Sequence, residues 1–184
     1  MRLLRFRRDR REEFEQDALP HLDALYRTAC WMLMDSSVAE DAVQETYMKA
    51  WRSFDGYEPG TNLRAWLFTI LVNCVRDIRS KANRERPATD SEAILAGQGG
   101  RPLPVSTITD AGLERALAKV PEERRRVIWM ADVEGLTYLE VSKALDIPIG
   151  TVMSRLSRGR RQLRESLEKP PSAEGNRLST DRRA

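Results

Sequence analysis

The chain has 184 residues, 41% of them hydrophobic and 32% charged, a size that suits one ordinary domain or two small ones. No apolar run approaches the roughly 18–20 residues that cross a bilayer. The basic residues at the N-terminus are not followed by the apolar stretch of a secretion signal. These features argue against a membrane-spanning or secreted protein, and we expect the chain to stay in the cytoplasm.

Residues that commonly bind metals are scarce. Cys30 and Cys74 lie far apart in apolar segments, neither belongs to a Cys-x-x-Cys pair, and His21 is the only histidine. A structural zinc site normally needs four ligands at characteristic spacings. We therefore expect both cysteines to be reduced core residues, and we expect no metal site and no cofactor.

The net charge of +3 is unevenly distributed along the chain. Residues 35–48 contain acidic side chains and no Lys or Arg, whereas residues 150–164 contain five arginines and no acid. An acidic face suits a basic partner, and a basic face suits a polyanion such as DNA. For either block alone, an ordinary solvated helix face is the alternative explanation.

Apolar spacing predicts three helices in the first part of the chain. The first runs from Phe14 to Leu33 despite Pro20. The second follows a polar turn at residues 35–37 and has one apolar stripe that includes Trp51. Its opposite face is polar apart from one methionine, and it is formed by Glu40, Asp41, Gln44, Glu45 and Met48.

A loop precedes the third helix. Residues 55–62 (DGYEPGTN) are rich in residues that break helices. Either Thr61 or Asn62 can cap the helix that follows. Trp66 lies on its apolar stripe, so we expect Trp66, like Trp51, in the core. The stripe is the strongest periodic signal in the chain and comprises Leu63, Trp66, Leu67, Ile70, Leu71, Cys74, Val75 and Ile78.

Residues 87–110 differ in composition from both flanking segments. Prolines and glycines are frequent there and little could bury a core, which is typical of a linker. The fold class is therefore all-α, with two small helical domains. We divide the chain into a basic N-terminal arm (1–13), a first domain (14–86), a flexible linker (87–110), a second domain (111–169) and a disordered tail (170–184).

The second domain has the pattern of a helix-turn-helix. A short helix starting at Ala111 is followed by one that Pro121 opens and that ends near Gly135. Thr137 and Glu140 then match a capping box, which starts a helix ending at Leu145. Residues 146–150 form a tight turn, and a final arginine-rich helix runs from residue 151 to about 167.

The two faces of the final helix differ in chemistry. Val152, Leu156, Leu163 and Leu167 can pack on the preceding helix. A helix in the major groove needs a row of side chains that contact base edges, flanked by cations that contact phosphates. Arg158 is our first candidate for a base contact, because an arginine paired with guanine contributes about 1–3 kcal/mol of discrimination. The face opposite the apolar one consists of Met153, Ser154, Ser157, Arg158 and Arg161.

Several segments resemble the extracytoplasmic-function (ECF) sigma factors of the sigma-70 family. Residues 39–46 (AEDAVQET) and 65–70 (AWLFTI) with Asn73 resemble the first conserved domain of that family. Residues 121–124 (PEER), 134–138 (EGLTY) and 150–156 (GTVMSRL) resemble the second. A helix-turn-helix alone is shared by many regulators, but both blocks in this order are specific to this family. The resemblance covers nearly all of residues 14–167.

The resemblance implies a partner for each surface. The acidic face of the second helix looks like the docking site for the clamp coiled coil of the largest RNA polymerase subunit. Its contacts would come from Asp41, Gln44, Glu45 and Met48. The implied function is promoter-specific transcription initiation with core RNA polymerase, in a stress response and under control of an anti-sigma protein, with no enzymatic activity of the chain itself.

Promoter contacts are also implied by the resemblance. The loop before the third helix would capture an unstacked base of the downstream (minus-10) element, and the third helix would hold the single strand. These contacts would come from Tyr57, Pro59, Gly60, Thr61, Asn62, Asn73, Arg76 and Arg79. The upstream (minus-35) element would be contacted by Tyr138, Thr151, Met153, Ser154, Arg155, Ser157, Arg158 and Arg161.

One residue departs from the family pattern, and two other classes of protein are alternatives. Most relatives carry Lys or Arg where this chain has Met153, and the methionine resembles a subgroup with redox-sensitive, zinc-containing anti-sigma partners. A two-domain response regulator has a similar helix-turn-helix but also an α/β receiver domain, for which no strand pattern exists here. An enzyme would need a nucleophile and base, a metal cluster or a phosphate-binding glycine loop, and none is evident.

Overall fold

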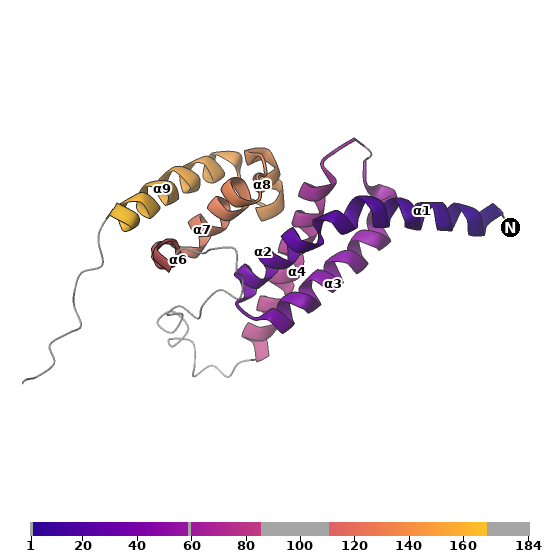
Figure 1. Ribbon diagram of the computed structural model, residues 1–184, viewed down its shortest axis with the longest axis horizontal. Coiled ribbons are helices and arrows are strands. Elements are labelled where there is room, and N and C mark those ends of the chain that lie inside the picture. The colour runs from indigo at the N-terminus through magenta and orange to yellow at the C-terminus, as the bar shows by residue number, and fades with distance from the viewer. Residues whose placement is uncertain (1, 59, 86–110, 169–184) are drawn as a thin grey trace, which may run out of the picture.

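The computed structural model describes residues 2–58, 60–85 and 111–168. Within these ranges no strand occurs, which confirms the all-α fold class. Figure 1 shows two groups of helices, α1–α4 and α6–α9, with α9 along the outer side of the second group. The residues predicted as linker (87–110) and as tail (170–184) all lie outside the described ranges.

The first group comprises four α-helices and two short 3₁₀ turns. The elements are α1 (Arg2–Ala18), η1 (Leu19–His21), α2 (Leu22–Leu33), α3 (Ser36–Ser53), η2 (Phe54–Gly56) and α4 (Leu63–Glu85). Their shared core is centred on α4, where Leu67, Phe68 and Leu71 are fully buried. Cys30 and Cys74 are buried and unpaired, so the prediction that both are core residues is confirmed.

The single helix predicted from Phe14 to Leu33 is wrong. The chain breaks into α1 and α2 at η1, which contains Pro20. Proline has no backbone N–H to donate, and its ring clashes with the carbonyl four residues earlier, so an uninterrupted helix is disfavoured there. The predicted N-terminal arm does not end at an element boundary either, because α1 continues through residue 13 to Ala18.

Aromatic packing holds α1 on the first domain. The Phe14 side chain is buried against three rings, with centroid distances of 6.3 Å to Tyr47, 5.4 Å to Trp51 and 5.0 Å to Phe54. The Tyr47 hydroxyl donates a hydrogen bond to the Ala18 carbonyl at 2.8 Å. Burial raises the pKa of Tyr47 to about 12, so this donor stays protonated. Trp51 is half-buried and packs on the core, as predicted.

The second group is the predicted helix-turn-helix domain. Its elements are α6 (Ala111–Ala118), α7 (Glu122–Ile128), η4 (Trp129–Val133), α8 (Tyr138–Leu145) and α9 (Ile149–Glu168). The capping box is confirmed, because Thr137 accepts from the Glu140 amide while the Glu140 carboxylate accepts from the Thr137 amide at 2.7 Å. Helix α7 ends in a single π turn (η4), which the periodicity did not predict.

Two details of α9 differ from the prediction. The helix starts at Ile149 rather than at Thr151, because the Pro148 carbonyl already accepts from the amides of Thr151 (2.8 Å) and Val152 (3.1 Å). Val152 and Leu156 are buried as expected, but Leu167 is 49% exposed. Leu167 lies one residue before the end of α9, where no described helix is left to cover it.

No helix among the described residues is both long and apolar enough to cross a membrane.

Candidate nucleic-acid interface

The acidic face predicted on α3 is open to solvent. Asp41 and Gln44 are exposed, and Met48 is 41% exposed. Glu45 is half-buried, and its carboxylate lies 3.8 Å from the Lys49 ammonium. Four of the predicted contacts are therefore on one side of one helix, but Glu45 is already paired with a cation of its own helix.

The loop before α4 is organised around Tyr57. Its ring stacks on Phe54 with 5.9 Å between centroids and lies 5.3 Å from the Trp66 ring. The Tyr57 hydroxyl donates to the Thr61 carbonyl at 2.5 Å, and the Thr61 hydroxyl donates to the Glu58 carbonyl at 2.8 Å. These bonds stiffen the loop, and they leave only part of the Tyr57 ring free to stack on a base.

The end of this loop starts α4. Gly60 has a φ of +89°, a backbone conformation that favours glycine. Asn62, not Thr61, caps the helix, since its Oδ1 accepts from the Ala65 amide at 3.2 Å. Pro59, which was also predicted to contact DNA, lies outside the described residues.

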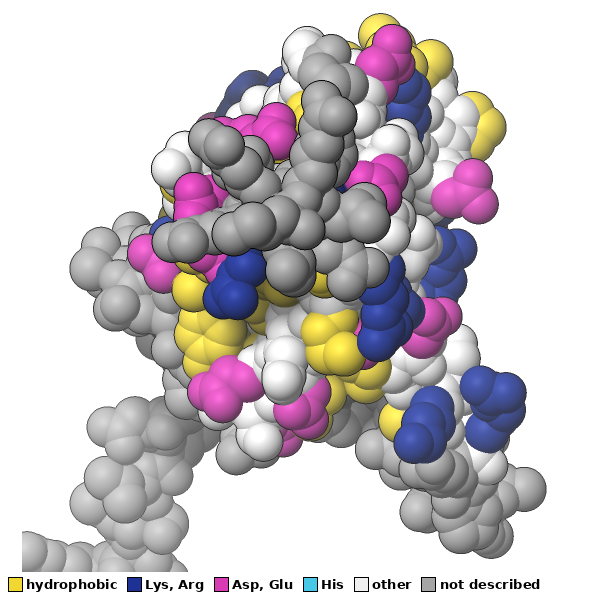
Figure 2. Space-filling view, turned by 90° about the vertical axis from the view of Figure 1, so that its right-hand side faces the viewer, with side chains coloured by type: hydrophobic (Ala, Val, Ile, Leu, Met, Phe, Trp, Pro, Cys, Tyr) yellow, Lys and Arg dark blue, Asp and Glu magenta, His cyan; other side chains and the backbone are white. Residues whose placement is uncertain are grey.

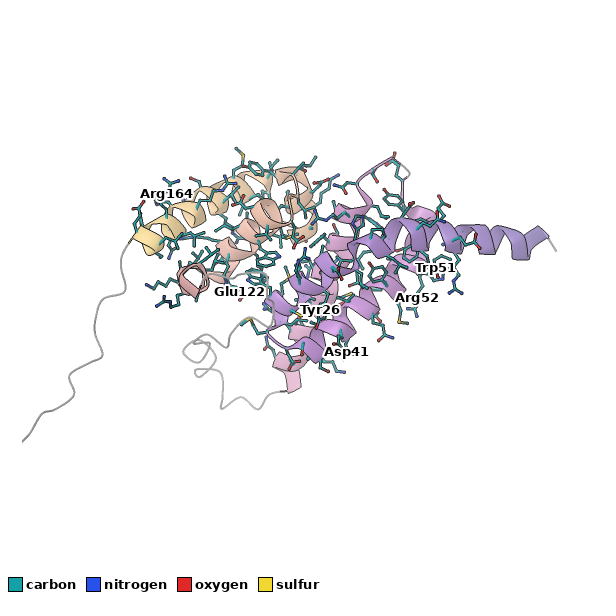
Figure 3. All side chains as sticks on the ribbon, in the orientation of Figure 1. Tyr26, Asp41, Trp51, Arg52, Glu122 and Arg164 are labelled. Carbon is teal, nitrogen blue, oxygen red and sulfur yellow. The ribbon has the colours of Figure 1, made fainter. Side chains whose placement is uncertain are left out.

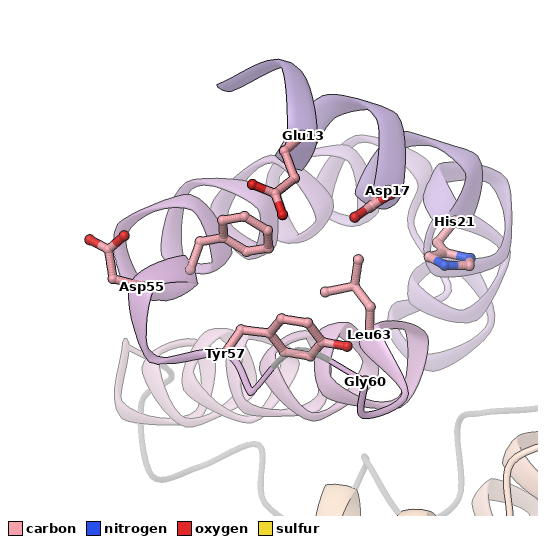
Figure 4. Close-up of a pocket in the computed structure, with 8 residues that line it drawn as sticks. Glu13, Asp17, His21, Asp55, Tyr57, Gly60 and Leu63 are labelled. Atoms are coloured by element: carbon pink, nitrogen blue, oxygen red, sulfur yellow. The ribbon is translucent and has the colours of Figure 1, made fainter. Parts of the chain in front are cut away.

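A cavity of about 530 Å³ opens between this loop and α1. Figure 4 shows Glu13 and Asp17 reaching from α1 toward the space above Tyr57, with Asp55 at its edge. Burial, together with the Arg64 charge, lowers the pKa of His21, so the imidazole is neutral at neutral pH. The cavity is lined by Glu13, Asp17, His21, Phe54, Asp55, Tyr57, Gly60 and Leu63.

Sequence reasoning missed the contribution of α1 to this cavity. The sequence predicts residue 13 as part of the N-terminal arm, whereas the structure places Glu13 and Asp17 one helical turn apart facing the loop. Their spacing of four indicates a shared helix face. Nothing in the sequence indicates that this face meets a loop some forty residues later.

The three predicted polar residues on α4 differ in accessibility. Arg76 is exposed and donates to the Asn73 side chain, which is half-buried. Arg79 is half-buried and donates to both the Glu122 carboxylate of α7 and the Met32 carbonyl. Of these three residues only Arg76 is exposed, whereas Asn73 and Arg79 are half-buried.

Most of the predicted outer face of α9 is exposed, but Thr151 and Arg155 are half-buried. The guanidinium of Arg155 is paired with Glu123 of α7 at 2.6 Å. Arg158 is exposed, and the Arg161 side chain is 74% exposed, with Glu165 at 4.0 Å. The other predicted residues are exposed or half-buried, and they are Tyr138, Thr151, Met153, Ser154 and Ser157.

A second cavity, of about 440 Å³, lies on this face. It includes two arginines that were not predicted as DNA contacts, Arg160 and Arg164. Arg160 is oriented by Asp132 of η4, with its Nε donating to Asp132 at 3.0 Å; this bond raises its pKa. Helical spacing from Arg161 would have indicated Arg164. The full lining is Tyr138, Met153, Leu156, Ser157, Arg160, Arg161 and Arg164.

The acidic face of α3 and the basic face of α9 are separate surfaces. Figure 3 shows Asp41 and Arg164 on opposite sides of the molecule. Figure 2 shows a different face, turned by 90°, on which basic, acidic and apolar side chains are interspersed. Fold and surfaces together define a two-domain helical protein with a helix-turn-helix whose last helix is suited to the major groove.

Comparison with known proteins identifies the family. The family model described as "Sigma-70 region 2" matches residues 19–85, and the model described as "Sigma-70, region 4" matches residues 111–163. The chain is 36% identical to the ECF RNA polymerase sigma factor SigE of Mycolicibacterium smegmatis, over 83% of this chain and 60% of that protein. It is 30% identical to the ECF sigma factor EcfG of Rhodopseudomonas palustris, over 83% of each.

Two solved structures are similar to this chain over most of its length. The chain is similar to the sigma factor RpoE of Bartonella quintana, crystallised with the anti-sigma factor NepR, with a TM-score of 0.69 and 34% identity over 85% of this chain and 97% of that one. It is also similar to CnrH, solved with the cytosolic domain of CnrY, with a TM-score of 0.59 and 26% identity over 85% and 88% of the two chains.

The chain therefore belongs to the ECF sigma factors of the sigma-70 family, which are DNA-binding transcription-initiation factors. The response-regulator alternative is not favoured. Its receiver domain would require strands in the first half of the chain, whereas the described residues there form only helices and match region 2 of a sigma factor.

Proposed function

We propose that the chain binds core RNA polymerase in the cytoplasm and directs it to a limited set of promoters, in a stress response, without catalysing a reaction itself. One observation carries this proposal: the two family-matched domains present an acidic face on α3 and an arginine-rich face on α9 on separate surfaces. A protein that links polymerase to DNA needs two such surfaces of opposite charge.

The first domain is proposed to contact both polymerase and the downstream promoter element. The exposed Asp41, Gln44 and Met48 would contact a basic surface of polymerase. The loop from Tyr57 to Asn62 would accept an unstacked base, since it combines hydrogen-bonding groups with an aromatic ring beside a cavity large enough for a base. Arg76 and Asn73 would follow the single strand.

The second domain is proposed to contact the upstream element through α9. Arg158 is the proposed base contact, because it lies on the exposed face and has no ion-pair partner among the described residues. Arg155, in contrast, is paired with Glu123. Arg161 and the newly identified Arg160 and Arg164 add positive charge beside it. Cations at this position neutralise phosphates and fix the register of the helix on DNA.

The domain boundaries deduced from the sequence remain part of the proposal. The segment 87–110 would connect the two domains, and its 24 residues, fully extended at up to roughly 3.3 Å each, would span about 80 Å. One turn of B-DNA is about 34 Å long. The connection is therefore long enough for domains on promoter elements about one and a half turns apart.

An inhibitory protein partner is proposed by analogy with the solved relatives. RpoE and CnrH are described in complexes with NepR and with the cytosolic domain of CnrY. We expect this chain to be held by an anti-sigma protein in a comparable way. A zinc-containing, redox-sensitive partner is suggested only by Met153.

Substitution of the α3 face tests the polymerase contact. Asp41→Ala with Gln44→Ala should weaken binding to core RNA polymerase at least about tenfold, as expected when about 1.4 kcal/mol of interface energy is lost. Both side chains are exposed, so the circular dichroism spectrum should not change. Asp23→Ala on α2, which also removes an exposed carboxylate, is the matched control. Unchanged affinity of the double variant in a pull-down with core enzyme would refute the docking site.

A further inference from the structure

Positive charge is concentrated in the first half of α1, residues 2–11, which we call the arginine segment. It contains six arginines and one aspartate, a net charge of +5, whereas the whole chain carries +3. All other residues together therefore carry a net charge of −2. The second half of α1 is acidic, and it supplies Glu13 and Asp17 to the cavity beside Tyr57. The six arginines are Arg2, Arg5, Arg7, Arg8, Arg10 and Arg11.

The order of charges along α1 does not serve the stability of the helix. A helix dipole favours acidic side chains in the first turn and basic side chains in the last. Helix α1 has no acid in its first turn and no basic residue in its last. Like charges three or four residues apart also destabilise a helix, and the sequence has this spacing between Arg2, Arg5 and Arg8. An anionic ligand explains the arginines, whereas helix stability does not.

The arginine segment is attached to the first domain at the start of the loop before α4. Arg10 Nε lies 2.9 Å from Asp55 Oδ1 of η2, and Arg10 Nη2 donates to the Trp51 carbonyl at 3.3 Å. The Arg10 guanidinium also lies over the Trp51 ring, 4.8 Å from its centroid. Figure 1 shows that the N-terminal part of α1 extends past the other helices of this domain. Arg10 thus fixes the direction in which the rest of the segment projects.

The position of the segment favours DNA as its anionic partner. Asp55, which is paired with Arg10, also lines the cavity proposed to accept an unstacked base. A strand whose base occupies that cavity continues past its edge, where the segment begins. From Arg2 to Arg10 the helix is about 12 Å long at 1.5 Å per residue, which matches three to four stacked nucleotides at about 3.4 Å each. The α3 face proposed for polymerase is acidic, so a basic partner suited to that face would repel the arginines.

We propose that the arginine segment binds the backbone phosphates of the DNA strand whose base enters the cavity beside Tyr57. Arginine pairs with phosphate through charge-assisted hydrogen bonds. Such contacts do not read the base sequence, so they raise affinity and fix the register of the strand for every promoter alike. Which strand is bound rests on the proposed function, whereas the binding of phosphates by the segment does not.

The test removes three charges from the segment of the full-length chain. The variant combines Arg5→Ala, Arg7→Ala and Arg8→Ala, and leaves the anchor Arg10 in place. Binding of a fluorescent, mixed-sequence, single-stranded DNA of about 20 nucleotides is followed by anisotropy between about 50 and 200 mM salt, because the slope of log affinity against log salt counts phosphate contacts.

The matched control removes the same charge near the other end of the chain, at arginines that lie outside the described residues. It combines Arg177→Ala, Arg182→Ala and Arg183→Ala. We expect the segment variant to lose about two units of salt slope, at about 0.7 per phosphate contact on a single strand, and to bind at least about tenfold more weakly at 50 mM salt. The control should keep the wild-type slope. Equal losses in both variants, or an unchanged slope in the segment variant, would overturn the proposal.

Two further measurements separate this proposal from a role in folding and from a lipid surface. The midpoint of urea unfolding of the segment variant should equal or exceed that of the wild type, because unfavourable charges have been removed. A lower midpoint would assign the arginines to the fold and contradict the proposal. Binding to vesicles of anionic phospholipid is the second measurement, since basic helices also bind such surfaces. If the segment variant loses vesicle binding but keeps its DNA affinity, the partner is a membrane and the proposal fails.

Failure of this inference differs from failure of the proposed function. If the wild-type chain does not start transcription with core polymerase but the two variants differ in salt slope as expected, the phosphate-binding segment stands and the sigma function does not. If the wild type starts transcription normally and the segment variant keeps the wild-type slope, the sigma function stands and the segment has no role in DNA binding.

Discussion

At the scale of single residues, the arginines of α9 are not equivalent, although the sequence presents them as one basic block. Arg155 is paired with Glu123 of α7, and Arg160 is paired with Asp132 of η4. Arg158 is exposed. Pairing fixes a guanidinium in place, whereas an exposed one can adjust to a base edge. The structure thus strengthens the case for Arg158 as the base contact.

Arg158→Ala should therefore change which base is preferred at one position of the upstream element. The expected loss of discrimination is about 1–3 kcal/mol at that position, because a bidentate contact with guanine would be removed. Binding of the variant to a set of duplexes that differ at single positions measures it.

Arg161→Ala is the matched comparison, since its side chain is also exposed but lies beside Glu165. This variant should weaken binding to all duplexes evenly and reduce the salt dependence by about one phosphate contact. Equal, sequence-independent losses in both variants would show that the two roles have been assigned wrongly.

At the scale of elements, periodicity located nearly every helix, and it failed where local backbone chemistry decides. The break at Pro20 follows from the amide that proline lacks, and the early start of α9 at Ile149 follows from two hydrogen bonds that the Pro148 carbonyl accepts. The π turn of η4 is similar, since the Glu134 amide bonds back to Trp129. Such local changes in hydrogen bonding leave the pattern of apolar residues almost unchanged.

The candidate site was predictable only in part for a related reason. The exposed row on α9 and the face on α3 each belong to one helix, so their spacing identifies them. The cavity beside Tyr57 joins α1 to a loop, and the contacts of Arg64 with Glu134 and of Asn62 with Glu140 join the two domains. Contacts between segments that are distant in the chain cannot be predicted from residue spacing in a single sequence.

The turn that leads into α8 can be tested through its glycine. Gly135 has a φ of +67°, and an alanine forced into this conformation costs about 1–2 kcal/mol. Gly135→Ala should lower the free energy of unfolding of the second domain by about that amount, measured by urea denaturation.

Gly150→Ala is the control for this prediction. Gly150 lies in the first turn of α9, and a Cβ there meets nothing within 4 Å. Alanine is the better helix former by up to about 1 kcal/mol, so this variant should be as stable as the wild type or more so. A Gly135→Ala variant as stable as Gly150→Ala would contradict the importance of the left-handed turn.

At the scale of the whole molecule, the protein has two helical domains, and we propose a separate partner for each. Polymerase would bind the exposed side of α3, and promoter DNA would bind the loop before α4 and the outer face of α9. The second domain also contacts the first directly, because Asn62 donates to Glu140 and Arg79 donates to Glu122.

The most direct test of the central claim is reconstituted transcription. Purified chain is added to core RNA polymerase that lacks any sigma factor, with a library of genomic DNA fragments as template, and the 5′ ends of the transcripts are sequenced. We predict initiation at a small set of start sites that share two sequence elements about one and a half helical turns apart. If the transcripts are identical with and without the chain, or if no transcript is made, this prediction is contradicted.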